Sequence, residues 1–354
     1  MSNKHLPQDL AQMQSLPLEA KEIMSDQRIG AWFTHWNCEV YVSFSGGKDS
    51  TVLADLVARY CARYGYKLYL LFVNTGLEYP EIQKFVKTFA EWLRNTYSIE
   101  VQLDIVRPKM RFDEVLKKYG YPVISKSVSH AVKIAKRNPD GKVMQNIFDP
   151  DNKGRFGFHK WKFLIDSDIP TSEECCNVMK KAPAKEYAKA TGRMPILGTM
   201  ADESSLRYSA WLKNGCNAFE GKNPTSQPLS FWTKQDILHY IKKYDVPYCS
   251  VYGDIVPTTE EKQIDGQITT FDLLNNYEGT DLKTTGCDRT GCIFCMFGCH
   301  LEKEPNRFQR LKETHPRQYE YCIGGGEMVD GKWQPSKEGL GLGKVLDFIG
   351  VKYD

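Results

Sequence analysis

The first part of the chain alternates short apolar runs with longer segments whose apolar residues recur every three or four positions. The runs lie at residues 39–45, 67–73 and 101–106, and a further one lies at 194–198. Short apolar runs bounded by polar residues are typical of strands buried in a parallel sheet. The pattern therefore predicts four strands of one sheet.

The segments around these runs have helical periodicity. Residues 16–36 are loosely periodic, residues 52–60 carry apolar side chains at i, i+3 and i+4, and a similar pattern follows Pro80. Proline is favoured at the start of a helix, where its missing N–H leaves no hydrogen bond unmade. Strands alternating with helices imply right-handed crossovers, so we expect an α/β fold with a doubly wound, mainly parallel sheet.

The pattern changes after residue 253. Residues 254–354 contain polar loops, clustered cysteines and a glycine-rich tail, with little apolar periodicity. Such a segment needs another source of order, which a bound metal would supply. We therefore expect an N-terminal helical segment 1–38, an α/β domain 39–253 and a small, irregular, metal-binding subdomain 254–354.

Composition narrows the class of protein. The chain has 354 residues, of which 41% are hydrophobic and 26% charged, as in folded globular proteins. Mean hydropathy is −0.48, and no apolar run approaches the ~20 residues of a membrane span, so no membrane partner is expected. The N-terminus lacks the features of a signal peptide, which predicts a cytoplasmic protein. In that reducing compartment we expect no disulfides among the 11 cysteines, and we interpret the clustered ones as metal ligands or catalytic groups.

Positive charge is concentrated in one segment, although the formal net charge is only +3. Between Lys126 and Lys162 there are nine basic and three acidic residues, and five aromatic residues lie between positions 148 and 163. Such a stretch suits the phosphate backbone of a nucleic acid. The alternative is a solvated loop and helix face, which is what charge runs usually are.

The sequence SGGKDS follows the first predicted strand and opens a predicted helix. Its two glycines let backbone N–H groups turn inward, and the helix N-terminus adds partial positive charge, so the loop is suited to bind an anion. The lysine adds a full charge, the serine hydroxyls donate hydrogen bonds, and the aspartate caps the helix or helps to hold a cation. The spacing of the Walker motif is absent, and the alternative is a plain strand-to-helix turn. The predicted phosphate-binding residues are Ser45, Gly46, Gly47, Lys48, Asp49 and Ser50.

This loop resembles the PP-loop of ATP pyrophosphatases, and three later motifs resemble the phosphoadenosine phosphosulfate (PAPS) reductase family of that superfamily. Residues 74–81 (NTGLEYPE) are similar to the family's second loop, 196–207 to its G-x-R-x-x-E-S-x-x-R segment and 227–236 to its P-L-x-x-W-x-x-x-D element. The resemblance covers about two-thirds of the chain. It implies an adenine nucleotide alpha hydrolase-like, Rossmann-like fold and a bound adenine nucleotide. Beyond the loop, it implies nucleotide contacts from Asn74, Thr75, Gly76 and Glu203.

One departure from the family pattern concerns charge. Met200 stands where the family has the arginine of G-x-R, whereas Arg207 is retained. The resemblance implies catalytic roles for Lys48, Asp49 and Arg207. Either another cation, for which Lys126 is a candidate, replaces the missing charge, or the substrate is not an adenylyl phosphosulfate.

The cysteines form a run C-x4-C-x2-C-x3-C and a separate tandem pair. Thiolates at such spacing converge within one coordination shell. Zinc and a four-iron–four-sulfur cluster both take four thiolates, and the spacing does not choose between them. Adenylyl sulfate reductases bind such a cluster with a C-C pair and a later C-x-x-C, so the resemblance implies the cluster. The implied ligands are Cys175, Cys176, Cys292 and Cys295, with Cys287 and Cys299 as alternates.

The family's E-C-G-[LI]-H motif, which carries the nucleophilic cysteine of its reductases, is absent. We therefore expect ATP, with Mg²⁺, to be cleaved at the α-phosphate to activate an acceptor, nucleic acid being one candidate. Sulfur from a donor such as a cysteine desulfurase would then displace the adenylate. The first alternative is a sulfonucleotide reductase that uses Cys322 or a spare cysteine of the metal loop. The second is a non-catalytic nucleotide- or nucleic-acid-binding module with structural zinc.

Overall fold

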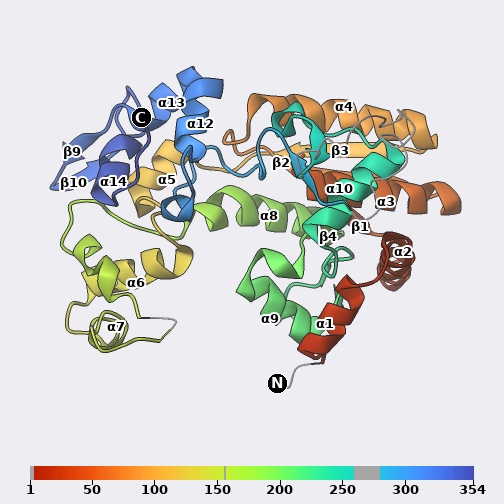
Figure 1. Cartoon of the computed structure of the whole chain (residues 1–354), viewed down its shortest axis with the longest axis horizontal. Coiled ribbons are helices and arrows are strands. Elements are labelled where there is room, and N and C mark those ends of the chain that lie inside the picture. The colour runs from red at the N-terminus through yellow and green to blue at the C-terminus, as the bar shows by residue number, and fades with distance from the viewer. Residues whose placement is uncertain (1–3, 155–156, 259–279) are drawn as a thin grey trace, which may run out of the picture. The chain divides into compact units, whose positions relative to one another are not determined.

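The computed structural model describes residues 4–154, 157–258 and 280–354 of the chain (Figure 1). The chain divides into two compact units, each assembled from separate stretches of sequence. The first unit comprises Met1–Asn74, Glu78–Val106 and Ala184–Thr290, and the second comprises Thr75–Leu77, Arg107–Pro183 and Gly291–Asp354. The predicted division into three consecutive segments stays a prediction.

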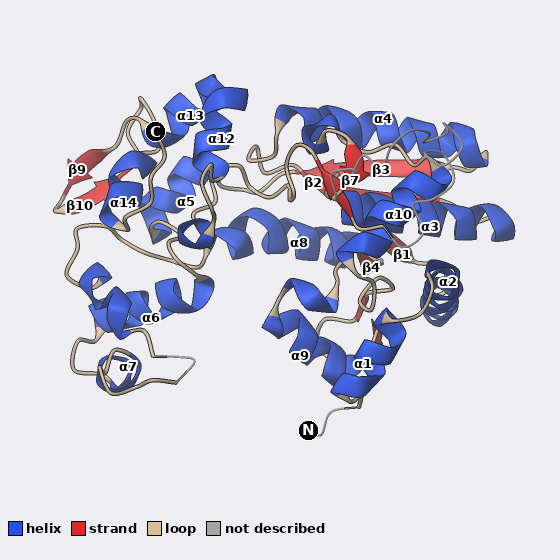
Figure 2. Cartoon of the chain, viewed as in Figure 1, coloured by secondary structure: helices blue, strands red, loops and turns tan. Residues whose placement is uncertain are grey.

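The first unit is built on a sheet whose described strands lie in the order β3-β2-β1-β4-β6-β5. Five of them run parallel, and the edge strand β5 is antiparallel to β6. This confirms the expected α/β fold with a mainly parallel sheet (Figure 2). The strands are β1 (Val40–Ser43), β2 (Leu68–Val73), β3 (Val101–Val106), β4 (Met194–Leu197), β5 (Asn217–Ala218) and β6 (Thr225–Ser226).

Helices cover both faces of this sheet. On one face, α3 packs against α2, α4 and α10, and buried strand residues such as Val42 belong to the same core cluster as these helices. On the other face, Tyr41 of β1 packs against Tyr187 of α8. The alternation arises because successive side chains of a strand point to opposite faces. The helices of this unit are α1 (Pro7–Gln14), α2 (Leu18–His35), α3 (Lys48–Tyr64), α4 (Pro80–Tyr97), α8 (Ala182–Thr191), α9 (Ser205–Asn214) and α10 (Lys234–Tyr244).

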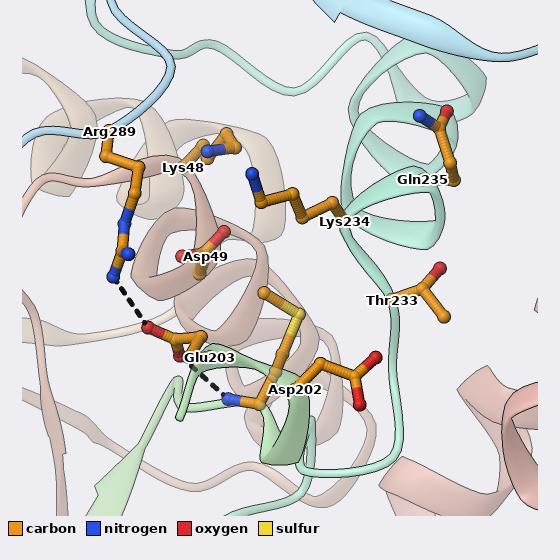
Figure 3. A pocket seen from close by; sticks show the side chains of 9 residues that line it. Lys48, Asp49, Asp202, Glu203, Thr233, Lys234, Gln235 and Arg289 are labelled. Atoms are coloured by element: carbon orange, nitrogen blue, oxygen red, sulfur yellow. Dashed lines mark hydrogen bonds and ion pairs between the residues drawn. The ribbon is translucent and has the colours of Figure 1, made fainter. Parts of the chain in front are cut away.

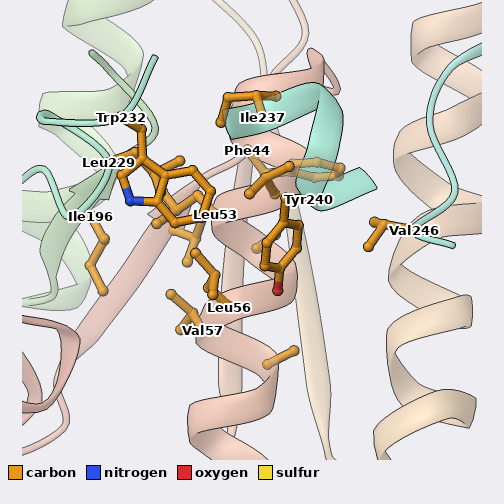
Figure 4. Packing of buried hydrophobic residues seen from close by; sticks show 14 of the residues in the cluster. Phe44, Leu53, Leu56, Val57, Ile196, Leu229, Trp232, Ile237, Tyr240 and Val246 are labelled. Atoms are coloured by element: carbon orange, nitrogen blue, oxygen red, sulfur yellow. The ribbon is translucent and has the colours of Figure 1, made fainter. Parts of the chain in front are cut away.

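Helix α3 is anchored by apolar packing along its length. Leu53 and Val57 are completely buried, and Trp232 and Ile237 lie in the same cluster (Figure 4). Burial of each such side chain contributes about 1.5–3 kcal/mol. The N-terminus of α3, where the SGGKDS loop lies, is therefore attached to a firmly packed element.

The second unit is mainly helical. Residues 307–348 include three short helices, so the tail is more regular than the irregular subdomain we expected. Asn306 caps α12 by accepting hydrogen bonds from the N–H groups of Phe308 (2.9 Å) and Gln309 (3.3 Å), and Pro316 opens α13. The elements are α5 (Phe112–Tyr119), α6 (Lys126–Arg137), α7 (Lys142–Ile147), α12 (Arg307–Thr314), α13 (Pro316–Ile323), α14 (Leu342–Phe348) and the antiparallel pair β9 (Glu327–Val329) and β10 (Lys332–Gln334).

Across the described residues, no helix combines the length and the apolar character needed to cross a membrane.

Residues 254–258 and 280–290 belong to the first unit, where β7 (Ile255–Pro257) pairs with β8 (Leu282–Thr284). The first part of the predicted cysteine-rich subdomain is thus folded onto the α/β unit.

Candidate phosphate site and cysteine centre

The SGGKDS loop joins the end of β1 to the start of α3. Strand β1 lies between β2 and β4, so the chain winds in opposite directions on its two sides. In open α/β sheets ligands bind at the carboxyl ends of the strands at this switch point. Gly46 has φ +73°, and a Cβ there would lie 2.9 Å from side-chain carbons of Ile82 and Val86. Only glycine satisfies both the backbone angle and the close approach.

The serine hydroxyls of the loop are bonded within it. Ser50 Oγ donates to the carbonyl of Gly47 at 2.9 Å and lies 3.0 Å from Ser45 Oγ. Ser50 Oγ also accepts from the Ser45 N–H at 3.2 Å. These contacts brace the turn, so the serines hold the loop's shape in this structure.

A cavity of about 380 Å³ opens beside the loop within the first unit. Figure 3 shows Lys234 reaching toward Lys48 and Arg289 reaching toward Glu203, with Asp49 between them. Cations and carboxylates thus share one space, as expected of a site for a metal-bound polyanion. The lining residues are Lys48, Asp49, Met200, Asp202, Glu203, Thr233, Lys234, Gln235 and Arg289.

Lys48 is only 5% exposed. Its ammonium donates to the backbone carbonyl of Asp288 at 2.7 Å and lies 5.2 Å from the ring centroid of Tyr252. The backbone N–H of Lys48 donates to the Tyr252 hydroxyl at 3.1 Å. The lysine predicted to meet phosphate is therefore held by oxygen atoms of its own chain.

The carboxylates that line the cavity are Asp49, Asp202 and Glu203. Within the described residues, Asp49 Oδ1 is buried and has no hydrogen-bond partner. Burial raises the pKa of Asp49, although the charge of Lys48 opposes the shift. Glu203 accepts from the N–H of Met200 at 2.9 Å and pairs with Arg207. Arg207 thus supports a lining carboxylate and is not among the described residues that line the cavity.

Two cations line the same cavity as Met200, which stands where the family has an arginine. Met200 lines the cavity, and positive charge reaches the same cavity from Lys234, at the start of α10, and from Arg289. Arg289 Nη2 lies 3.3 Å from Glu203 Oε2. The cation named from the sequence, Lys126, is placed in the second unit instead, where it hydrogen-bonds the thiol of Cys176.

The predicted residues of the second loop are divided between the units. Asn74 belongs to the first unit, where its N–H donates to the Val106 carbonyl at 2.8 Å. Thr75 and Gly76 belong to the second. There the Leu77 carbonyl accepts from the N–H of Ile293, at 2.8 Å.

The four cysteines of the implied ligand set all belong to the second unit. The Sγ atoms of Cys175 and Cys176 are 3.9 Å apart, at the start of a helix that passes through a π-helical turn (Asn177–Lys181). The hydrogen bond to Cys176 and burial raise the pKa of Cys175, and the nearby Cys295 and Cys292 add to the shift. Even so, the described residues contain no group of three or more His, Cys, Asp or Glu side chains placed to hold a metal ion.

Cys176 has a thiol of unusual acidity. A hydrogen bond from Cys175 and the positive charges of Lys126 and Lys180 lower the pKa of Cys176 to about 6, against the opposing effect of burial. At neutral pH this side chain is a thiolate, which is the form that binds metal or attacks an electrophile.

A partly buried arginine secures the loop that contains Cys292 and Cys295. Arg307 Nη1 donates to the Cys295 carbonyl at 2.8 Å, and Arg307 Nε donates to Glu302 Oε1 at 2.8 Å. Of the two alternates, Cys299 is buried and donates to the Met296 carbonyl at 3.0 Å. Cys287 belongs to the first unit, with its Sγ 3.7 Å from the Tyr79 hydroxyl. Cys287 thus belongs to a different unit from the four implied ligands.

Cys322, the nucleophile of the reductase alternative, is completely buried. Burial raises its pKa well above the usual value of a thiol. A neutral, inaccessible thiol is a poor nucleophile, so the structure gives Cys322 a packing role.

The basic segment lies in the second unit, and its partly buried lysines, Lys133 and Lys136, have internal partners. Lys133 pairs with Glu173 at 2.6 Å, and Lys136 donates to the carbonyls of Ser167 and Ile169. Arg155 and Phe156 lie outside the described residues. The exposed basic residues are Lys126, Arg137, Lys142, Lys153, Lys160 and Lys162.

Comparison with known proteins gives a family and a distant relative. The model of the phosphoadenosine phosphosulfate reductase domain matches residues 39–147 and 142–297. The uncharacterized protein MJ0973 of Methanocaldococcus jannaschii is 24% identical over 309 residues, which is 84% of this chain and 50% of that protein. The chain thus spans about half the length of the curated relative it matches.

Two solved structures show low similarity. NMN synthetase from Francisella tularensis has a TM-score of 0.34 at 15% identity, over 66% of this chain and 73% of its own. The U34-tRNA thiolase NcsA from Methanococcus maripaludis, solved with its 4Fe-4S cluster, has a TM-score of 0.31 at 15% identity, over 65% of this chain and 66% of its own. Similarity at this level carries no functional argument.

Proposed function

The chain belongs to the phosphoadenosine phosphosulfate reductase domain family, and from this premise we propose that it is an ATP-cleaving enzyme of sulfur transfer. ATP binds at Ser45–Ser50 and is cleaved at the α-phosphate, which activates an acceptor. The observation that carries the proposal is the cavity beside this loop, because it combines buried Lys48 with two further cations and with carboxylates.

The cavity supplies groups for each charge of this reaction. An acceptor oxygen attacks the α-phosphorus, the bond to the β-phosphate breaks, and pyrophosphate leaves with additional negative charge. Lys48 and the amides at the start of α3 stabilise that charge. Asp49 and Glu203 offer the oxygen ligands that Mg²⁺ prefers, and a cation at Asp49 would give its unpartnered Oδ1 a ligand. Mg²⁺ would enter with the nucleotide.

The cysteines of the second unit fit a metal centre by their chemistry. Cys175, Cys176, Cys292 and Cys295 would hold a four-iron–four-sulfur cluster, which takes thiolate ligands, and the low pKa of Cys176 keeps one of them ionised at neutral pH. A bound cluster would supply a site that carries sulfur. Arg307 holds the Cys295 carbonyl and so fixes the loop that carries this ligand. Zinc at the same thiols is the alternative.

We propose a nucleic acid as the acceptor and a persulfide as the sulfur donor. Exposed lysines such as Lys142, Lys160 and Lys162 suit a nucleic-acid acceptor, because phosphate backbones bind through lysine and arginine. The sulfur that displaces the adenylate would come from a persulfide donor such as a cysteine desulfurase.

The test is turnover of ATP labelled at the α-phosphate, with and without RNA. Pyrophosphate and labelled, adenylylated RNA are expected, with AMP released once a persulfide donor is added. Lys48→Ala should abolish release of pyrophosphate, whereas Lys283→Ala, which removes an exposed lysine of β8, should not. Release of sulfite from a phosphosulfate, without ATP cleavage, would instead identify a reductase. Neither product, together with zinc and no iron after anaerobic purification, would identify a binding module.

A further inference from the structure

Asp288 accepts hydrogen bonds from two of the lysines that line the phosphate cavity. Its backbone carbonyl accepts from Lys48 Nζ at 2.7 Å, and its carboxylate oxygen Oδ2 lies 3.0 Å from Lys234 Nζ. Burial alone would raise the pKa of Asp288, but the hydrogen bond from Lys234 and the charges of Lys48 and Arg289 outweigh it and lower the pKa. One residue thus presents two oxygens to two ammonium groups, as a polyphosphate would.

The residues after Asp288 also contact the loop region. Arg289 contacts Glu203. The Thr290 hydroxyl lies 2.7 Å from the Tyr252 hydroxyl, which itself accepts from the Lys48 N–H. The Asp288 carbonyl therefore binds the ammonium group of Lys48. Thr290 contacts the Tyr252 hydroxyl, which binds the backbone amide of Lys48.

We propose that Lys234 and Arg289 bind the β- and γ-phosphates of a nucleoside triphosphate alongside Lys48, and that Asp288 is an internal ligand which these phosphates displace. The proposal rests on the proposed function and assigns the residues that hold the distal phosphates of its substrate. The charge of the site supports it, because three cations converge on a cavity whose nearby carboxylates suit a divalent metal. Lys234 and Arg289 lie at the cavity wall whereas Met200 offers no charge, so these two residues decide how many phosphates are held.

Displacement is chemically favourable for the cations. A phosphate oxygen bonds an ammonium or guanidinium group more strongly than a neutral carbonyl does, because the bond is assisted by charge on both partners. Asp288 and Lys234 are 67% and 58% exposed at their side chains, and exposed ion pairs contribute little. The Asp288–Lys234 pair is therefore weak enough for a triphosphate to replace it.

The test is calorimetric binding of Mg²⁺ with α,β-methylene ATP, and of AMP, to the full chain. Lys234→Met and Arg289→Met should each weaken the analogue by about 10- to 100-fold and change AMP binding by less than about twofold, because AMP lacks the distal phosphates. Lys283→Met, which removes an exposed lysine of β8, serves as the matched control for net charge. Asp288→Asn keeps the backbone carbonyl but removes the competing charge, so it should tighten the analogue by about 3- to 10-fold.

The outcomes separate this inference from the proposed function. If Lys48→Ala abolishes binding of the analogue while Lys234→Met and Arg289→Met bind it like the unaltered protein, the two-cation assignment is wrong and the phosphate loop stands. If Asp288→Asn binds no more tightly, Asp288 is not an internal ligand. If the unaltered protein binds no analogue, both the inference and the proposed function fail. Arg289→Lys should recover part of the affinity, which distinguishes a lost charge from a lost fold, and thermal unfolding of each variant checks the latter.

Discussion

Asp55 connects the phosphate-loop helix to its neighbours, and we predict that Asp55→Ala destabilises the first unit. The carboxylate accepts from Arg59 Nε at 2.9 Å, from the Tyr97 hydroxyl at 2.6 Å and from the Tyr240 hydroxyl at 2.7 Å. Tyr97 belongs to α4 and Tyr240 to α10. Since α3 carries Lys48 and α10 carries Lys234, this network sets the spacing of the two lysines.

The size of the effect follows from burial. Asp55 is completely buried, whereas the side chain of Arg59 is 31% exposed. Removing one partner of a buried ion pair costs about 3–5 kcal/mol, because the other charge is left without compensation. Water can reach Arg59 in part, so we expect the lower end, a loss of about 3 kcal/mol in the free energy of unfolding.

Urea unfolding followed by tryptophan fluorescence measures this loss. With a denaturant slope of about 3 kcal/mol/M, the midpoint should fall by about 1 M. Asp26→Ala is the matched control, because it also removes an aspartate paired with an arginine of α3, but Asp26 and Arg63 are 34% and 52% exposed. That pair should contribute about 0–1 kcal/mol. If the two variants shift the midpoint equally, the network does not hold α3 in place.

Three further predictions concern the site and its surroundings. Tyr252→Phe removes the acceptor of the Lys48 N–H and should cost about 1–2 kcal/mol; an unchanged thermal midpoint would contradict this. In metal-free protein, the rate of Cys176 alkylation should rise with pH through about 6 and then level off, because the thiolate predominates above its pKa. Peptide mass spectrometry measures this rate, and buried Cys322 should stay unmodified. A midpoint near the ordinary pKa of a thiol would refute the assignment of a thiolate to Cys176. Lys160→Gln should weaken RNA binding at low salt and reduce the salt slope by about 0.7–1, and equal salt slopes for both proteins would remove Lys160 from the interface.

The strands of the sheet could be predicted from the sequence because each is a short, nearly continuous apolar run. Strand β3 begins and ends at the predicted residues, and β2 differs by one. Helices α12 and α13 could not be predicted in the same way. Each has eight residues, too few turns for an apolar period to show, and local signals such as the Asn306 cap set their starts.

The candidate site could be predicted only where it is local in sequence. Lys48 and Asp49 were expected in the site because a strand-to-helix turn places consecutive residues at one anion, and both line the cavity. Lys234, Asp288 and Arg289 were missed, since they meet the loop only through tertiary structure. Lys234 did lie within the motif at 227–236, but nothing in that motif marks the lysine as a ligand.

Because Lys234 and Arg289 line the same cavity as Met200, the absence of the family arginine does not by itself identify the substrate. A missing motif arginine indicates a missing charge only if no other segment brings a cation to the same place. Here Arg289 and Lys234 bring two, so Met200 alone does not exclude a phosphosulfate. ATP and a phosphosulfate differ instead in the anionic groups that Lys48, Lys234 and Arg289 must meet. A triphosphate offers two phosphates, β and γ, beyond the scissile bond for the two added cations. A site with more positive charge beside Lys48 therefore favours ATP.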